Sequence, residues 1–361
     1  KLRFPGFDEP WSIYKAEELF KNVADKNHPM ETVLTIIQGK GTLPREQAGR
    51  NIHYDDASLA NYKKVEQGDF IIHLRSFEGG LEMANEDGIV SPAYTILRCK
   101  KPHSSLFYEA YFHTDEFINH ILSKSVEGIR DGRQISYEAF KWLGLPYCDV
   151  SEQERIAQLF CTLSHRIEKQ QQMVDALKKY KRGLIKLVFE KVMSEAHYQL
   201  PLSDLCISIS SGRTTVNESN GRYPLFGSTG IVGMTNTIEH DGDIVMVARV
   251  GANAGKVNFF SGRCGVTDNT LVIRVKENTI HPKFLAYFLE NFDLHKLIFG
   301  SGQPLVTGGQ LKKIQSPVIA YKAQLLITRS LESLDRIIGT QDTYMEKLIQ
   351  LKSGLMQRLF I

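Results

Sequence analysis

The chain has 361 residues, of which 42% are hydrophobic and 24% charged, and this length and composition predict a globular protein of two domains. A formal net charge of +3 excludes a polycation, so any nucleic-acid surface must come from local clusters of basic side chains. No apolar run approaches the ~20 residues of a membrane span. Five scattered cysteines without a CxxC pair fit a reducing cytoplasm and argue against a structural zinc site.

Residues 1–150 alternate short apolar segments with turns, which predicts a mixed α/β domain. Gly, Pro and polar side chains predict loops, and apolar periodicity predicts one helix near the end of this region. The expected elements are, in order, a strand at 33–37, a loop at 38–50, a turn and strand at 65–75, a strand at 94–98, a helix at 106–124 and a polar loop at 128–134.

Residues 151–191 carry the heptad pattern of a coiled coil. Two positions of this apolar seam are polar, Gln170 and Lys181. A helix of this length would span roughly 55–60 Å, which is too long for a compact domain of this size. The apolar seam residues, at alternating steps of four and three, are Ile156, Phe160, Leu163, Ile167, Val174, Leu177, Leu184 and Val188.

The second half of the chain repeats the first. Residues 192–320 predict a second mixed domain, in which Gly242-Asp243 and Arg249 lie 174 positions after Gly68-Asp69 and Arg75. Its expected elements are a turn and strand at 240–249, a strand at 271–275, a helix at 284–299 and a polar loop at 300–304.

The final stretch, residues 321–361, is a second heptad helix. Its polar interruptions, Gln341 and Lys352, lie 171 positions after those of the first helix. Two ordinary amphipathic helices in a globular core would seldom repeat their polar exceptions as well. We therefore predict an internal duplication with pseudo-two-fold symmetry, in which the two helices form an antiparallel coiled coil with a domain near each end.

Motifs of enzymes are missing from the chain. The segment Gly251-Ala-Asn-Ala-Gly-Lys-Val257 has three residues where a P-loop needs four, and Val257 replaces the Ser or Thr that meets Mg²⁺. There is no GxGxxG after a strand, no HExxH, and no Asn-Pro-Pro-Tyr or Asp-Pro-Pro-Tyr tetrapeptide of amino-methyltransferases. The sequence therefore predicts a protein that binds rather than catalyses, without catalytic or metal-ligating residues.

Basic and amide-bearing side chains gather where loops are expected in both halves. Arg recognises guanine and Asn or Gln recognises adenine through paired hydrogen bonds, while Lys more often holds phosphates. Solvated loop charge is the simpler explanation for any one of them, but Arg75 and Arg249 recur at equivalent strand ends. The candidate DNA-binding residues are Lys40, Arg45, Arg50, Arg75, Arg130, Arg133, Gln134, Arg213, Asn217, Arg222, Arg249, Asn253, Lys256 and Gln303.

The order of domain, long helix, domain and long helix resembles the specificity subunit of type I restriction–modification enzymes over essentially the whole chain. Two positions depart from the pattern: Ala323 replaces the expected Glu before Gln324, and Ser164 stands where the second copy has Asp335. The motifs that carry the resemblance are Leu2-Arg-Phe-Pro-Gly-Phe7 with Trp11, Tyr62-x-x-Val65-x-x-Gly68-Asp69, Glu152-Gln153-x-x-Ile156-Ala157, Tyr223-Pro-x-Phe226-Gly-Ser, Gly242-Asp243-Ile-Val and Lys352-x-Gly354-Leu-Met-Gln357-x-Leu359-Phe360.

The resemblance implies that residues 1–150 and 192–320 are target recognition domains, each recognising one half of a bipartite DNA sequence. Residues 151–191 and 321–361 would be the conserved helices that set the gap. The chain would be non-catalytic and cytoplasmic, without a cofactor or membrane contact of its own. It would dock modification subunits, two in number, that use S-adenosylmethionine, and restriction subunits that use ATP and Mg²⁺.

Two rival hypotheses come from other classes of protein. One is a non-catalytic coiled-coil scaffold whose end domains bind protein partners. The other is a self-contained methyltransferase or nuclease, against which the missing motifs argue. DNA binding and activity of the purified chain would separate the three.

Overall fold

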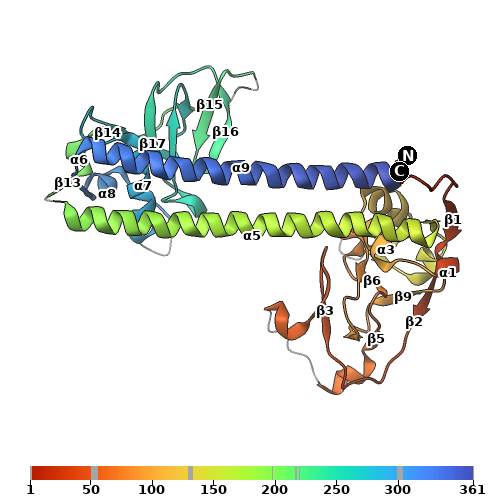
Figure 1. Ribbon diagram of the computed structural model, residues 1–361. Coiled ribbons are helices and arrows are strands. Elements are labelled where there is room, and N and C mark those ends of the chain that lie inside the picture. The colour runs from red at the N-terminus through yellow and green to blue at the C-terminus, as the bar shows by residue number, and fades with distance from the viewer. Residues whose placement is uncertain are drawn as a thin grey trace. The chain divides into compact units, whose positions relative to one another are not determined.

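The structure is a computed structural model that describes residues 2–49, 56–128, 133–196, 198–215, 218, 220–298 and 304–360. These residues form an α+β structure in two compact units (Figure 1). Unit 1 comprises Lys1–Gln171 with Tyr344–Ile361, and unit 2 comprises Gln172–Thr343. Within the described part of the chain, no helix is long and apolar enough to cross a membrane.

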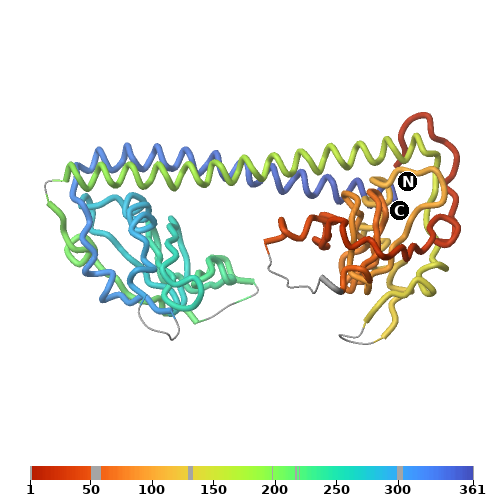
Figure 2. Tube along the Cα trace, turned by 90° about the horizontal axis from the view of Figure 1, so that it is seen from below, coloured from red at the N-terminus to blue at the C-terminus, as the bar shows by residue number. Residues whose placement is uncertain are grey.

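Two long helices, α5 (Val150–Glu195) and α9 (Tyr321–Phe360), confirm the long helices predicted from the heptad pattern. Each of them contributes residues to both units. Within each unit the two helices lie side by side (Figures 1 and 2).

The helix pair is antiparallel within each unit. In unit 2, Lys178 pairs with Asp342 and Lys181 pairs with Asp335, so the partner number falls as the first number rises. In unit 1, the ring of Phe160 stacks 5.9 Å from that of Phe360, while Ser164 meets Lys352. These contacts agree with the predicted antiparallel coiled coil.

The buried stripe of α5 departs from a strict heptad towards its end. Ile156, Phe160 and Leu163 are buried as predicted. Farther along, Ile185 and Phe189 are buried, whereas the predicted seam positions one residue before them are only partly buried. A straight α-helix drifts by about 20° per heptad against a 3.5-residue repeat, which moves the buried face by one position.

Among the residues that the structure describes, unit 1 contains a four-stranded antiparallel sheet in the order β2-β9-β6-β7 and four two-stranded sheets, β1-β12, β3-β4, β5-β8 and β10-β11. Its elements are β1 (Ser12–Lys15), α1 (Ala16–Leu19), β2 (Phe20–Val23), β3 (Leu34–Ile37), β4 (Gly41–Pro44), η1 (Arg45–Ala48), η2 (Asp56–Asn61), β5 (Lys63–Val65), β6 (Phe70–Ile72), α2 (Ser76–Gly79), β7 (Glu82–Met83), β8 (Gly88–Val90), β9 (Thr95–Cys99), α3 (Ser105–Phe112), η3 (Glu116–Ile121), η4 (Leu122–Ser125), β10 (Val126–Glu127), β11 (Gln134–Ile135), α4 (Tyr137–Phe140) and β12 (Gly144–Tyr147).

Unit 2 contains a four-stranded antiparallel sheet in the order β14-β20-β17-β18, a three-stranded sheet β16-β15-β19 and the pair β13-β21. Its elements, besides the long helices, are β13 (Gln199–Pro201), α6 (Leu202–Leu205), β14 (Cys206–Ser211), β15 (Tyr223–Gly227), β16 (Gly230–Thr235), β17 (Asp243–Ala248), η6 (Gly251–Asn253), β18 (Val257–Ser261), β19 (Gly265–Val266), β20 (Thr270–Val275), α7 (Pro282–Phe292), η7 (Leu294–Leu297), α8 (Gly308–Lys312) and β21 (Gln315–Pro317).

The two four-stranded sheets share one topology. If β2, β9, β6 and β7 are matched to β14, β20, β17 and β18, strand order and direction agree throughout. In both units a helix, α3 or α7, follows the second strand of this order and packs in the main core with one of the long helices. The internal duplication predicted from the sequence is therefore a duplication of sheet, helix and long helix.

Aromatic side chains fill both main cores. In unit 1, Phe107 and Phe112 of α3 pack with Phe20 and Phe70 of the sheet, and Phe360 of α9 joins the same cluster. In unit 2, Phe189 of α5 contacts Phe284 and Phe288 of α7 at ring distances of 5.2 and 5.7 Å. The long helices are thus part of the hydrophobic core of each unit rather than appended linkers.

Three local predictions were wrong. The helix predicted at 284–299 ends at Phe292 and is followed by the 3₁₀ turn η7. The segment 38–50, predicted as a loop, contributes strand β4, which forms a hairpin with β3. The helix predicted at 106–124 ends at Phe112 and is followed by the π-helical turn η3 and the 3₁₀ turn η4. The hydroxyl of Thr114 accepts the N–H of Phe117 and donates to the carbonyl of Tyr111, which starts a new turn in place of a continuous helix.

A buried carboxylate joins α5 to the N-terminal segment of unit 1. Glu152, 1% exposed, accepts both Nε and Nη2 of Arg3 at 2.6 and 2.9 Å, and the indole N–H of Trp11 at 2.9 Å. In unit 2 the position 171 residues later is Ala323, so this joint belongs to one copy alone.

We expect Glu152→Ala to lower the free energy of unfolding by about 3–5 kcal/mol, because it leaves the Arg3 guanidinium largely buried without its carboxylate. The control, Glu154→Ala, removes an exposed carboxylate from the same turn and should change stability by less than about 0.5 kcal/mol. Urea denaturation of the full chain measures both. Equal losses for the two variants would contradict the assigned role of Glu152.

Candidate nucleic-acid interface

Several predicted DNA-binding residues of unit 2 lie at one edge of the four-stranded sheet, where its strands begin or end. Because neighbouring strands are antiparallel, β14 and β17 end at the edge where β18 and β20 begin. We call residues 212–213, 249–256 and 267–270 the loop edge of unit 2. Gly212 N donates to Thr270 O at 3.0 Å and Arg249 N donates to Asn269 O at 2.8 Å, which ties these segments together.

Arg249, Asn253 and Lys256 all lie on the connection from β17 to β18 within this loop edge. The Arg249 carbonyl accepts the N–H of Val306, so the segment after β17 is held on both sides. The φ angle of Gly255, just before Lys256, is 87°, a left-handed conformation that favours glycine. The backbone of this connection is therefore defined independently of its basic side chains.

Arg213 is placed on the loop edge by a carboxylate. Glu239 accepts the backbone N–H of Arg213 at 2.9 Å and both the N–H and the hydroxyl of Thr214, at 3.1 and 2.7 Å. Burial alone would raise the pKa of Glu239, but these hydrogen bonds outweigh it and lower the pKa. The carboxylate stays ionised and fixes the backbone that carries the exposed Arg213 side chain.

Arg222 lies away from the loop edge. It precedes β15 in the three-stranded sheet, and its N–H donates to Asn236 Oδ1 at 3.3 Å. The structure therefore separates Arg222 from the group formed by Arg213, Arg249 and Lys256.

Unit 1 has the equivalent edge, where β2 and β6 end and β7 and β9 begin. Arg75 caps the N-terminus of the short helix α2 here, with its side chain 72% exposed and its Nε 3.6 Å from Glu78. Arg133 lies beside the same helix, with its guanidinium carbon 4.2 Å from the ring centre of Phe77. Gln134 follows in β11, where it pairs with Glu127.

Lys40 occupies the turn of the β3–β4 hairpin between two glycines with left-handed φ angles, 73° and 75°. Glu82, at the start of β7, accepts the N–H groups of Gly39 and Gly41 at 2.7 and 2.9 Å. Asn85 Nδ2 donates to the carbonyl of Lys40 at 2.7 Å. This exposed lysine is thereby held against the edge of the sheet.

Glu82 is fully buried and carries an ionised side chain. Burial alone would raise its pKa, but hydrogen bonds from His113 and from the two glycine N–H groups outweigh burial and lower it. Burial likewise opposes the charge on His113, yet the contact with Glu82 at 3.3 Å raises the histidine pKa above its ordinary value. The Lys40 turn thus depends on the buried Glu82 carboxylate and its contact with His113.

The remaining predicted residues lie elsewhere. Arg45 is at the opposite end of the β3–β4 hairpin, with its guanidinium carbon 5.9 Å from the ring centre of Tyr62. Four predicted residues lie outside the described part of the chain: Arg50, Arg130, Asn217 and Gln303.

Sequence reasoning missed the two carboxylates that position these loops. The hydrogen-bond partners of Glu82 and Glu239 are 25 to 43 residues away along the chain, so no local motif marks them. Among the residues the structure describes, no group of three or more His, Cys, Asp or Glu is arranged to hold a metal ion.

Comparison with known proteins gives consistent matches. A family described as the type I restriction modification DNA specificity domain matches residues 199–348. The EcoprrI type I restriction enzyme specificity subunit of Escherichia coli is 28% identical over 123 residues, which are 34% of this chain and 30% of that protein. The MjaVIII specificity subunit of Methanocaldococcus jannaschii is 28% identical over 156 residues, 40% of this chain and 36% of that protein. The chain thus matches about a third of the length of these relatives.

The fold agrees over a longer range. The crystal structure of the S subunit of a type I restriction–modification system from M. genitalium superimposes with a TM-score of 0.65 at 13% identity, covering 99% of this chain and 97% of that one. At this identity the likeness shows the shared fold. Residues 199–348 match the type I restriction modification DNA specificity domain, and parts of the chain are similar to type I specificity subunits.

Proposed function

We propose that this chain recognises a bipartite DNA sequence, with each unit contacting one half-site through its loop edge. The observation that carries the proposal is the repeated sheet, which presents basic residues at the equivalent edge in both units: Arg75 after β6 and Arg249 after β17. Arginine at such an edge suits guanine recognition or phosphate contact in the major groove.

The chain acts without catalysis or a cofactor of its own in this proposal. Its partners are modification subunits, two in number, that bind S-adenosylmethionine, and restriction subunits that bind ATP and Mg²⁺. The complex works in the cytoplasm, where it meets chromosomal DNA. The match of residues 199–348 to the type I specificity domain supports these partners, and the chain's lack of P-loop and methyltransferase motifs agrees with chemistry on other subunits.

The gap between the half-sites is set by the helix pair. Helices α5 and α9 have 46 and 40 residues, which corresponds to about 60–70 Å at 1.5 Å per residue. Two DNA-binding surfaces held at a fixed separation contact bases at one spacing, and the bases between them are not recognised.

Arg249→Ala tests the assignment of the loop edge. We expect recognition of one half-site to weaken by about 1–3 kcal/mol while the other is unchanged, because each unit contacts its own half. The matched control is Arg263→Ala, since Arg263 follows β18 at the opposite edge of the same sheet and pairs with Asp241. Base-modification sequencing of DNA from cells that co-express the chain and its modification subunit measures both; an equal loss at both half-sites would contradict the proposal.

A heptad inserted into each long helix tests the spacing. The insertions lie between residues 171 and 172 and between residues 343 and 344, at the boundary of the two units. Seven residues add about 10 Å, so we expect the unread gap to grow by about three base pairs with both half-site sequences retained. The same sequencing experiment gives the gap directly. An unchanged gap in a complex that still methylates DNA would reject the helix pair as the spacer.

Glu82→Gln tests whether the buried charge positions Lys40. At pH 7 we expect the free energy of unfolding to fall by about 2–4 kcal/mol, because charged hydrogen bonds to the turn are lost, and DNA binding at one half-site to weaken. The folded-state pKa of Glu82 is lowered, so its stabilisation is complete above about pH 4.3 and disappears as pH falls through the folded pKa.

The difference between wild type and Glu82→Gln should therefore shrink in acid, as measured by urea denaturation across pH. Glu46→Gln, an exposed change in the turn that follows the same hairpin, is the control and should cost less than about 0.5 kcal/mol. A difference that does not depend on pH would argue against an ionised Glu82.

A further inference from the structure

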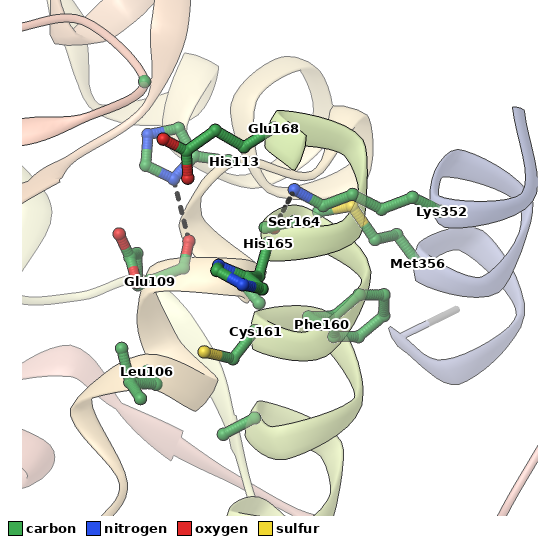
Figure 3. Close-up of a pocket in the computed structure, with 13 residues that line it drawn as sticks. Leu106, Glu109, His113, Phe160, Cys161, Ser164, His165, Glu168, Lys352 and Met356 are labelled. Carbon is green, nitrogen blue, oxygen red and sulfur yellow. Dashed lines mark hydrogen bonds between the residues drawn. The ribbon is translucent and has the colours of Figure 1, made fainter. Parts of the chain in front are cut away.

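Unit 1 contains a cavity of about 510 Å³ between α3, α5 and α9. Figure 3 shows Lys352 of α9 reaching towards Ser164 of α5, with Glu109 of α3 and His113 at the end of that helix on the facing wall. Gly39, from the turn that carries Lys40, completes the lining. The cavity therefore adjoins both the helix pair and the hairpin turn.

The charges in this cavity are incompletely matched. Lys352 Nζ donates a hydrogen bond of 2.8 Å to the hydroxyl of Ser164. Among the residues that the structure describes, Lys352 forms no ion pair with a carboxylate. Burial lowers the pKa of Lys352 and raises that of Glu109. An ammonium group at the wall of a cavity without a bound carboxylate favours an anionic ligand.

The internal duplicate shows what completes such a site. In unit 2, Lys181, which precedes Lys352 by 171 residues, lies 2.8 Å from Asp335 and 3.5 Å from Glu290. The hydroxyl of Tyr287 also donates to Asp335. These residues line a cavity of about 210 Å³, and Asp335 also borders a second cavity of about 470 Å³. Two acidic groups and a hydroxyl thus surround the lysine in unit 2.

The position of Asp335 corresponds, at the same spacing, to Ser164 in unit 1. The substitution removes the carboxylate and leaves a hydroxyl donor at the wall of the cavity of about 510 Å³. Glu109 of α3 and Glu168 of α5 also line the cavity. Unit 1 therefore has the lysine of the arrangement in unit 2 without the carboxylate that corresponds to Asp335.

We propose that the cavity of unit 1 is a carboxylate-binding site, in which a carboxylate from outside the chain takes the place that Asp335 has in unit 2. Its oxygens accept hydrogen bonds from Lys352 Nζ and from the Ser164 hydroxyl. Glu109, when protonated, donates a third hydrogen bond. The carboxylate comes from a small metabolite or from an Asp or Glu side chain of a docked protein, and the two sources share this chemistry.

The test uses the full chain labelled with ¹³C at its methionine methyl groups. Met356 lines the cavity, and its NMR signal is identified by its loss in Met356→Leu. Sodium acetate is titrated against sodium chloride at constant ionic strength. We expect a saturable shift of the Met356 signal in the wild type and its loss in Ser164→Asp, where the new carboxylate fills the site, and in Lys352→Met.

The reciprocal variant is Asp335→Ser, which copies the unit 1 arrangement into unit 2. It should make the thermal midpoint of the chain more sensitive to acetate than that of the wild type. Ser333→Asp, which adds a carboxylate to an exposed position of α9, is the control and should leave the Met356 response unchanged.

A second arm distinguishes the sources of the carboxylate and rests on the proposed function. If acetate leaves Met356 unshifted, but Ser164→Asp and Lys352→Met each weaken the affinity for the modification subunit at least tenfold, the carboxylate is a partner side chain. Failure of the wild type to bind that subunit would reject the proposed function, whereas acetate binding is measured without it. The carboxylate site is overturned if acetate shifts Met356 equally in Lys352→Met, or if there is neither an acetate response nor a loss of partner affinity in the two variants.

Discussion

A buried glutamine in the first turn of each long helix is the contact on which the rest of each unit depends. Gln153, fully buried, accepts the N–H of Ser104 at the start of α3 and donates to the carbonyl of Cys148. Gln324, 1% exposed, accepts the N–H of His281 at the start of α7 and donates to the carbonyl of Ile319. Each side chain satisfies a backbone group of a helix end while tying the long helix to the helix that packs in the same core, so its loss would leave buried groups unpaired.

The sequence predicted the elements that are marked by a periodic pattern of apolar residues. It did not predict elements whose conformation depends on contacts between residues far apart in the chain. The polar interruptions of the heptads, 171 positions apart, were enough to predict both long helices and the duplication. The β3–β4 hairpin was missed because its strand residues are interspersed with the glycines and the proline of a loop. The buried carboxylate of Glu82, 41 residues from Gly41, holds those residues as a strand and turn, and no local pattern encodes that contact.

The same distinction applies to the candidate site. Arg75 and Arg249 could be matched from the sequence because each follows a Gly-Asp pair at a constant spacing. The structure also puts Arg133 beside Arg75, through the ring of Phe77, although 57 residues separate the two arginines. Arg222 precedes β15, whose three-stranded sheet is separate from the four-stranded sheet that carries Arg249. The placement of such connecting strands follows from packing rather than from residue type.

The contacts that hold each unit together are repeated in both copies, and a few positions on the long helices distinguish the two copies. The glutamine joints and the sheet order recur in both units, so loops at the sheet edge can change while the support that carries them stays the same. The differences on the helices are of another kind. Glu152 has Ala323 as its counterpart and Ser164 has Asp335, which alters charge on a repeated backbone. Of these two exchanges, Ser164 against the part-exposed Asp335 makes the copies differ in surface charge along their helices, and a partner that senses charge can tell one unit from the other.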